Sequence, residues 1–168
     1  MVGLAIDGTE VSDLTPLKGM KLTALYCSST KVADLTPLKG MQTLKTLFCT
    51  ATRVSNISPL EGMALTTFSC EFTRVSDLSA LKGMQLRELY ITGTKVSDLS
   101  PLGGMQLHVL YCSNTQVSDL SPLRGMPLKD IKCNFEPKRD AELLRSMATL
   151  ETINGQPAKK FWKEVDAK

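Results

Sequence analysis

One sequence unit occurs six times in this chain, and this repetition constrains the fold more than any other feature. The tripeptide Val-Ser-Asp, or a close variant, begins at Val11, Val32, Val54, Val75, Val96 and Val117. The intervals are 21, 22, 21, 21 and 21 residues, and the longer one contains an extra residue, Thr43. A fixed period of this length indicates a solenoid, in which stacked repeats bury apolar side chains that no single repeat could bury alone.

The first part of each repeat predicts a β-strand with one buried face. The unit can be written L-x-x-L-x-C-x-x-T-x-V-x-D-L-x-P-L-x-G-M-x, where x varies. Side chains alternate along an extended segment, so Leu25 and Cys27 fall on one side, and Ala24 and Tyr26 on the other. Stacked copies therefore predict a parallel sheet, and the leucine spacing with this period is typical of leucine-rich repeats.

The second part of each repeat, such as Asp34 to Met41, predicts a short helical turn. Pro37 would interrupt a strand in the interior of a sheet. Thr36 is placed to cap a turn that has Pro37 at its first position, and Gly40 suits the exit from that turn. The few residues before the next strand leave room for one α or 3-10 turn and not for a long helix.

Together these elements predict a single α/β domain, a leucine-rich-repeat solenoid, over residues 1–168. About seven parallel strands would line the concave face of a shallow arc, and the short turns would line its convex face. Residues 1–133 hold the repeats, the first of them truncated, and residues 134–168 form a C-terminal helical cap. In the cap we expect a helix from Lys138 to Met147, a last strand within Thr149 to Asn154, and a helix starting at Pro157 that packs Phe161, Trp162 and Val165 over the end.

The segment from Thr94 to Cys112, TKVSDLSPLGGMQLHVLYC, resembles bacterial leucine-rich repeats of the internalin type. That family usually has asparagine nine residues into the unit, where this chain has Thr9, Thr30, Thr52, Thr73, Thr94 and Thr115. A hydroxyl can make part of the hydrogen bonds that an amide makes. The C-terminal segment resembles the closing segments of repeat domains attached to large bacterial proteins, including protein kinases, although the chain contains no kinase motif. The resemblance implies a binding module within a larger bacterial protein.

All the cysteines of the chain occupy one position of the repeat, which predicts that they pack in the core. They are Cys27, Cys49, Cys70, Cys112 and Cys133, and Ile91 fills the remaining slot. Cysteine is often buried and packs as a small apolar residue. Sulfurs spaced about 5 Å apart in a line do not make the tetrahedron that zinc needs, so we expect no metal site. An occasional disulfide and a reactive thiol remain alternatives.

The residues that precede these core positions form a column on the outer face of the sheet. The column reads Tyr26, Phe48, Ser69, Tyr90, Tyr111 and Lys132. Aromatic side chains on a surface are common anchors for a partner, but they also stack on their neighbours across a sheet. Beside the column, Glu71, Phe72 and Glu88 interrupt positions that are otherwise small or uncharged. We predict a partner-binding surface made of Tyr26, Phe48, Glu71, Phe72, Glu88, Tyr90 and Tyr111, with lateral packing as the alternative.

A second column, the basic ladder, follows the threonines and consists of Lys31, Arg53, Arg74 and Lys95. It lies between Glu10 and Gln116. Like charges about 5 Å apart repel one another, so we expect compensation from an acidic column made of Asp34, Asp77, Asp98 and Asp119. A solvated charge ladder and a site for an acidic partner are both open interpretations.

Other features of the sequence argue against several classes of function. The net charge of +3 is too small to indicate nucleic-acid binding. His108 is the only histidine, and no nucleophile has a base beside it in the sequence, so we expect no catalytic residue and no cofactor. The sequence shows neither a signal-peptide pattern nor an apolar stretch long enough for a membrane span. Together with free thiols, this predicts a cytoplasmic protein without membrane contact.

The function predicted from these patterns is non-enzymatic recognition of a protein or peptide on the concave face, within a larger bacterial regulatory or signalling protein. Leu4 and Ile6 already occupy strand positions, so the chain starts inside a repeat without a cap. An uncapped sheet edge invites self-pairing, which makes a structural element, a monomer or weak homodimer through the N-terminal edge, the first alternative. A secreted, internalin-like adhesion protein is the second.

Overall fold

The computed structural model describes residues 2–167, in which each repeat contributes one short strand and one 3-10 turn. The strands are β1 Gly3–Ala5, β2 Ala24–Tyr26, β3 Thr46–Phe48, β4 Thr67–Ser69, β5 Glu88–Tyr90, β6 Val109–Tyr111, β7 Asp130–Lys132, β8 Thr152–Ile153 and β9 Gln156–Pro157. The 3-10 turns are η1 Thr15–Leu17, η2 Thr36–Leu38, η3 Ser58–Leu60, η4 Ser79–Leu81, η5 Ser100–Leu102 and η6 Ser121–Leu123. The helices are α1 Pro137–Ser146 and α2 Ala158–Asp166.

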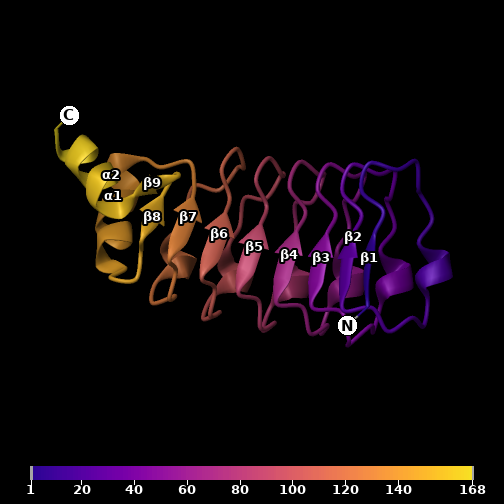
Figure 1. Ribbon diagram of the computed structural model, residues 1–168. Helices are drawn as coiled ribbons and strands as arrows, with labels where there is room; N and C mark the ends of the chain where they lie inside the picture. Colours follow the sequence, from indigo (N-terminus) through magenta and orange to yellow (C-terminus); the bar gives the residue numbers. More distant parts are fainter. Residues whose placement is uncertain (1, 168) are drawn as a thin grey trace.

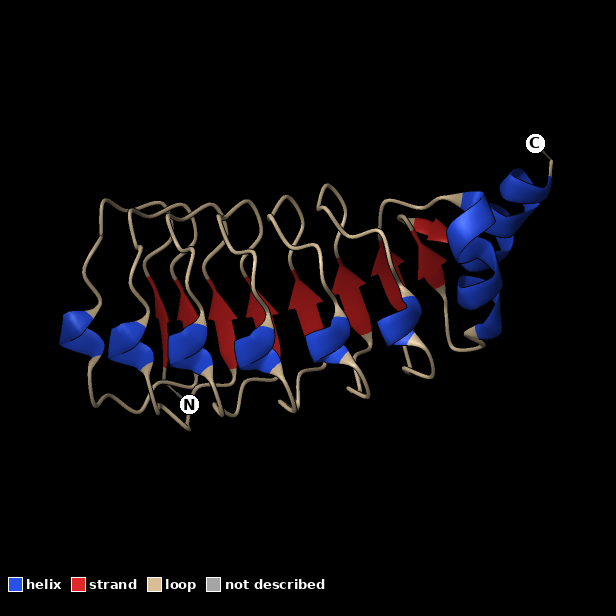
Figure 2. Ribbon diagram, turned by 180° about the vertical axis from the view of Figure 1, so that it is seen from behind, coloured by secondary structure: helices blue, strands red, loops and turns tan. Residues whose placement is uncertain are grey.

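Within residues 2–167 the nine strands form one sheet in sequence order. Strands β1 to β8 pair in parallel, and β9 runs antiparallel to β8. Equivalent positions of the repeat pair with each other, as Leu25 does with Leu47. Figure 1 shows the strands side by side in one row, and Figure 2 shows the 3-10 turns on the opposite side. The predicted leucine-rich-repeat solenoid is confirmed, with β1 to β7 in the repeats.

The apolar positions of the repeat fill the space between the sheet and the 3-10 turns. In the second repeat these side chains are at most 8% exposed: Leu22, Leu25, Cys27, Val32, Leu35, Leu38 and Met41. Full burial of a leucine-sized side chain stabilises a fold by about 1.5–3 kcal/mol. Because each repeat forms one wall of the cavity that its neighbour fills, this stabilisation exists only in the stack.

The threonine of each repeat closes the loop that follows the strand. Each hydroxyl donates a hydrogen bond to the backbone carbonyl three residues earlier, over 2.6–2.7 Å. In the loop after β4, for example, Thr73 Oγ1 donates to the carbonyl of Cys70 and Thr73 is only 6% exposed. The hydroxyl therefore makes a local hydrogen bond to the backbone at the repeat position where the internalin-type repeat usually has asparagine.

The acidic column has a local role that differs from the expected one. Its carboxylates accept the backbone N–H two residues later, at the start of a 3-10 turn, over 2.7–2.8 Å. Asp13 and Asn56 do the same at the other two turns, over 2.7 and 2.9 Å. The prediction that Thr36 caps its turn is wrong, because Thr36 is the first residue of η2 and Asp34 Oδ1 accepts its N–H. Hydrogen bonds from the backbone and side chain of Ser100 hold the pKa of Asp98 below its usual value.

The C-terminal cap covers the last repeat much as expected. Helix α1 buries Leu143 and Leu144 against the end of the stack, and Met147, directly after the helix, is buried there as well. The expected last strand is β8, and the short strand β9, which the sequence did not indicate, leads into α2. Phe161 and Trp162 of α2 pack edge to face with Phe135, at ring-centroid distances of 5.0 and 5.9 Å. Val165 is half-buried in the same helix.

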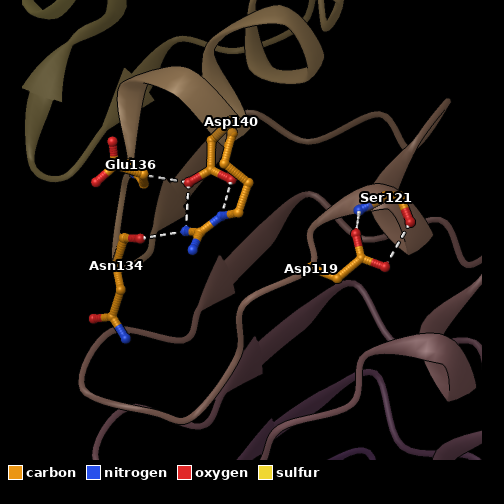
Figure 3. Close-up of polar contacts among 6 residues, drawn as sticks. Asp119, Ser121, Asn134, Glu136 and Asp140 are labelled. Atoms are coloured by element: carbon orange, nitrogen blue, oxygen red, sulfur yellow. Dashed lines mark hydrogen bonds and ion pairs between the residues drawn. The ribbon is translucent and has the colours of Figure 1, made fainter.

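A buried carboxylate orders the first residues of the cap (Figure 3). Asp140 is 1% exposed, and its Oδ2 accepts the N–H of Glu136 at the start of α1 over 2.8 Å. The guanidinium of Arg139 donates to both carboxylate oxygens over 2.7 Å and also to the carbonyl of Asn134. This network fixes the start of α1 relative to the chain that leaves β7.

Candidate interaction surfaces

Four aromatic side chains stack along the outer face of the sheet, which we call the concave face. This aromatic ladder consists of Tyr26, Phe48, Tyr90 and Tyr111, the third residues of their strands. The ring centroids of Tyr26 and Phe48 lie 5.5 Å apart, and those of Tyr90 and Tyr111 lie 5.1 Å apart, edge to face. Beyond Tyr111, Lys132 Nζ lies 4.1 Å from the ring centroid, a cation–π contact that ends the ladder at β7.

The ladder continues across β4, which carries a serine instead of an aromatic residue. Strands β3 and β5 are about 9.6 Å apart because two strand spacings separate them. The centroids of Phe48 and Tyr90 are nevertheless only 6.2 Å apart, so the two rings lean towards each other. Ser69 lies in register between them and is fully buried, with its hydroxyl 2.7 Å from that of Thr50. The ladder is thus one continuous surface from β2 to β7.

Two carboxylates of the concave face orient the phenols of the ladder. Tyr111 donates to Asp130 Oδ2 over 2.6 Å, and Tyr90 donates to Glu88 Oε2 over 3.1 Å. The hydrogen bond to Asp130 raises the pKa of Tyr111 to about 12. Burial, together with the charge of Glu88, raises the pKa of Tyr90. Both phenols therefore stay protonated at neutral pH.

Asp130 is a further residue of this surface, which the sequence pattern did not indicate. It precedes Lys132 by two residues and lies in register with Val109 of the neighbouring strand. Among the described residues its Oδ1 is buried without a hydrogen-bond partner, while its Oδ2 holds Tyr111. The signal that could have found it is its place in the outward column that also contains Glu88, next to Tyr111.

Exposure differs along the aromatic ladder. Tyr26 is 38% exposed, whereas Phe48, Tyr90 and Tyr111 are half-buried against one another. Tyr26 pairs in register with Ala5 of β1, so no aromatic side chain on β1 stacks on that side of its ring. The same aromatic side chains therefore pack on one another and still leave part of their apolar surface accessible. The two interpretations drawn from the sequence are not exclusive.

Phe72 stands apart from the ladder, in the loop after β4. It is 60% exposed, and its backbone has a φ of 55°. The equivalent loop residues also have positive φ, and they are small or polar: Gly8, Ser29, Ala51, Gly93 and Asn114. A bulky side chain in the left-handed region is an outlier that favours a functional reason over a structural one. Glu71, the preceding residue, is half-buried.

The basic ladder lies just beyond Phe72, on successive loops. The backbone N–H groups of Arg53, Arg74 and Lys95 each donate to a valine carbonyl of the previous repeat over 2.8–3.0 Å, which holds them in line. Lys31 forms an ion pair with Glu10. In residues 2–167 no carboxylate lies within 4.0 Å of the charged groups of Arg53, Arg74 or Lys95. The expected compensation by the acidic column is wrong, because those carboxylates bind the 3-10 turns.

The cysteine column lies on the buried face of the sheet, with exposures of 0–6% for Cys27, Cys49, Cys70, Cys112 and Cys133. All five thiols are free. Cys27 and Cys49 donate weak hydrogen bonds from Sγ to carbonyls of the next strand, over 3.3 and 3.2 Å. Burial raises the pKa of Cys70 to about 12. No group of three or more metal-ligating side chains occurs among the residues described here.

The stacked strand-and-turn units define a leucine-rich-repeat protein with internalin-like repeats. Among solved structures, the chain is similar to an internalin C2 (inlC2) from Listeria monocytogenes, with a TM-score of 0.66 and 26% identity over 91% of this chain and 70% of that one. It also has the fold of an internalin (inlF) from the same organism, with a TM-score of 0.61 and 21% identity. That match covers 89% of this chain and about half, 52%, of the other. No protein-family model and no curated protein sequence matches the chain.

None of the helices in residues 2–167 combines the length and the apolar character that a membrane crossing requires.

Proposed function

We propose that this chain is a non-enzymatic recognition module that binds a protein or peptide partner on its concave face. The observation that carries the proposal is the continuous aromatic ladder from Tyr26 to Lys132. Stacked leucine-rich repeats present an extended face that suits protein recognition. Aromatic side chains with few rotatable bonds lose little conformational entropy on binding, so they are efficient anchors.

The environment of the ladder supports this assignment. Its rings are held in place laterally, and the hydroxyls of Tyr90 and Tyr111 are fixed by Glu88 and Asp130. A partner would therefore meet a surface whose side chains are already ordered, which lowers the cost of association. As part of the same proposal, the module belongs to a larger bacterial regulatory or signalling protein in a reducing compartment, where free cysteines persist.

Affinity capture with the immobilised chain tests the proposal. The variant is the double substitution Tyr90→Ala and Tyr111→Ala, and the matched control is Lys82→Ala, an exposed residue at the end of η4 on the convex side. Proteins that bind the wild type and the control, but not the double variant, would support the concave face as the site. Thermal unfolding of all three chains would check that each of them is folded. An identical set of captured proteins in every case would refute the proposal.

A second candidate function is self-association through the N-terminal end of the stack. Val2 is 57% exposed and Met20 is 44% exposed, and the apolar residues Leu4, Ile6 and Val11 are only partly buried there. Apolar groups beside an edge strand favour pairing with a second copy. Sedimentation over a wide concentration range tests this candidate, since a monomer throughout would rule it out. A secreted adhesion role is less well supported, because the five cysteines are free.

A further inference from the structure

Three successive loops follow the carboxyl ends of β3, β4 and β5, and they carry Arg53, Phe72 with Arg74, and Lys95. Each cation follows a loop residue of positive φ by two positions, namely Ala51, Phe72 or Gly93. The backbone hydrogen bonds of the basic ladder place the three loops side by side. An exposed aromatic residue therefore lies on the middle one of three neighbouring loops that each carry a cation.

The position of the Phe72 ring is set by its neighbour. Gly93 has no side chain, and a Cβ there would lie 2.6 Å from Cδ1 and 2.9 Å from Cε1 of Phe72. The ring thus rests directly on the backbone of the next loop, while 60% of the residue remains exposed. On the other side, Ala51 offers only a methyl group. The ring therefore packs beside the backbone of the next loop on one side and stays accessible on the other.

The charges around Phe72 define the chemistry of an occupant. Arg53, Arg74 and Lys95 are exposed, and none of them is within ion-pair distance of a described carboxylate, whereas Lys31 pairs with Glu10. Within the basic ladder, the positive charge without an ion-pair partner is therefore confined to three loops, a length of about 10 Å. In the next repeat after Lys95, the equivalent position is the uncharged Gln116, so the basic ladder ends there.

The same geometry argues for a protein segment over a nucleic acid. A polyanionic backbone gains from a long row of cations, and this row is short. Glu71 precedes Phe72 directly, and Glu88 and Asp130 lie on the adjoining sheet face, so a continuous polyanion would meet three carboxylates. A short peptide can place acidic side chains over the cations and an apolar side chain over Phe72 without extending to Glu88 and Asp130.

We propose that Phe72, Arg53, Arg74 and Lys95 form a second docking surface, the ridge site, for a short acidic protein segment whose apolar side chain packs on Phe72. The ridge site does not depend on the concave face having a partner. Phe72 supplies the apolar anchor, and the three cations select the charge of the segment.

Fluorescence anisotropy with three labelled peptides and one oligonucleotide tests the ridge site. The first peptide carries glutamates around a central leucine. In the second the glutamates are glutamines, and in the third the leucine is glycine. The fourth probe is a single-stranded oligothymidylate. We expect saturable binding of the first peptide, and at least about tenfold weaker binding of the second and the third.

Protein variants place the binding on the ridge site. Phe72→Asn, which keeps a residue that tolerates positive φ, should weaken the first peptide by about tenfold. Arg74→Gln should weaken it as well. Lys31→Gln is the matched control and should have little effect, because Glu10 already neutralises Lys31. Phe72→Gly also removes the aromatic side chain and should weaken the first peptide to a similar extent. Thermal unfolding checks that each variant is folded.

Several results would overturn the ridge site. These are a lack of saturable binding of the first peptide, equal binding of the glycine peptide, or unchanged affinity in both Phe72 variants. Oligothymidylate binding as tightly as the first peptide would show simple attraction of polyanions. Loss of peptide binding in the Tyr90→Ala, Tyr111→Ala double variant alone would move the peptide to the concave face. Intact peptide binding in that variant would support the ridge site even if the concave face captures nothing.

Discussion

Phe72 and Gly93 form a mutually dependent pair on adjacent loops. Both have positive φ, 55° and 70°, and the Phe72 ring occupies the space where a Cβ of residue 93 would lie, 2.6 Å from Cδ1. At Gly104, which has a φ of 76°, an added Cβ would meet no atom within 4 Å. Gly93 is therefore required both by its backbone conformation and by its neighbour's ring, whereas Gly104 is required by conformation alone.

This pair gives a quantitative prediction. Gly93→Ala should cost about 1 kcal/mol for the left-handed backbone and about 1–3 kcal/mol more for the displaced ring. Gly104→Ala should cost only the backbone part. In a Phe72→Ala background, Gly93→Ala should also cost only that part, so a double-mutant cycle by urea denaturation should show coupling. Equal costs of Gly93→Ala in both backgrounds would contradict the contact.

The carboxylates at the 3-10 turns predict how stability depends on pH. Hydrogen bonds from the side chain and backbone of Thr36 lower the pKa of Asp34 from 3.8, and hydrogen bonds from Ser121 lower that of Asp119. A group with a lowered folded-state pKa stabilises the fold fully above its unfolded pKa, and this stabilisation is lost as the pH falls through the folded value. Unfolding free energy should therefore be steady down to about pH 5 and fall progressively below it.

Asparagine at these positions separates the hydrogen bond from the charge. Asn56 already accepts the N–H of Ser58 over 2.9 Å. Asp98→Asn should therefore keep the turn at neutral pH and reduce the loss of stability in acid. Denaturant titrations of both chains between neutral and acidic pH measure this difference. A variant with the same acid dependence as the wild type would show that Asp98 does not contribute.

The sequence predicted the parts of this fold that follow from periodicity. Leu25 and Leu47 pair in register because a slip by one residue would expose every buried side chain of the strand. The short turns followed from Pro37 and its equivalents. The prediction that the acidic column compensates the basic ladder was wrong. An aspartate two residues before a serine or threonine at a turn instead indicates a side-chain hydrogen bond to the backbone N–H.

The sequence could not predict the details of the site that depend on side-chain packing in space. Phe48 and Tyr90 lean over Ser69 because the small residue leaves room, and their rotamers depend on that neighbour. The positive φ of Phe72 was not predicted, although Gly8 and Asn114 at the same repeat position tolerate that conformation, and its contact with Gly93 depends on packing between loops. Asp130 was not predicted because the column that it shares with Thr67, Glu88 and Val109 shows no regular residue type.

The hydrogen bond between Tyr111 and Asp130 predicts a shift in the titration of the phenol. Asp130→Asn removes the carboxylate that favours the protonated phenol, so the pKa of Tyr111 should fall from about 12 towards the ordinary 10.0. Ultraviolet titration of tyrosinate, compared with Tyr111→Phe to assign the signal, measures the change. Glu88→Gln is the matched control and should move the pKa of Tyr90 less, because burial is the main cause there. An unchanged Tyr111 titration would contradict the assigned bond.

The hydrogen bonds of Asp140 predict how firmly the start of α1 is held in the cap. Its buried carboxylate accepts the Glu136 N–H and two bonds from Arg139, which in turn holds the carbonyl of Asn134 (Figure 3). Asp140→Ala leaves these donors without their acceptor, and we expect a loss of about 2–4 kcal/mol in unfolding free energy. Hydrogen exchange should accelerate in α1 more than in β2 to β5, because the damage is local.

A control on the same helix separates this network from general helix effects. Glu142 is exposed in α1, and Glu142→Ala should change stability by less than about 0.5 kcal/mol. Denaturant unfolding of both variants makes the comparison. If the two substitutions cost the same, the carboxylate of Asp140 does not anchor the cap. If Asp140→Ala is costly but exchange rises evenly along the chain, the cap and the repeats unfold as one unit, because loosening the last turn then destabilises every stacked neighbour.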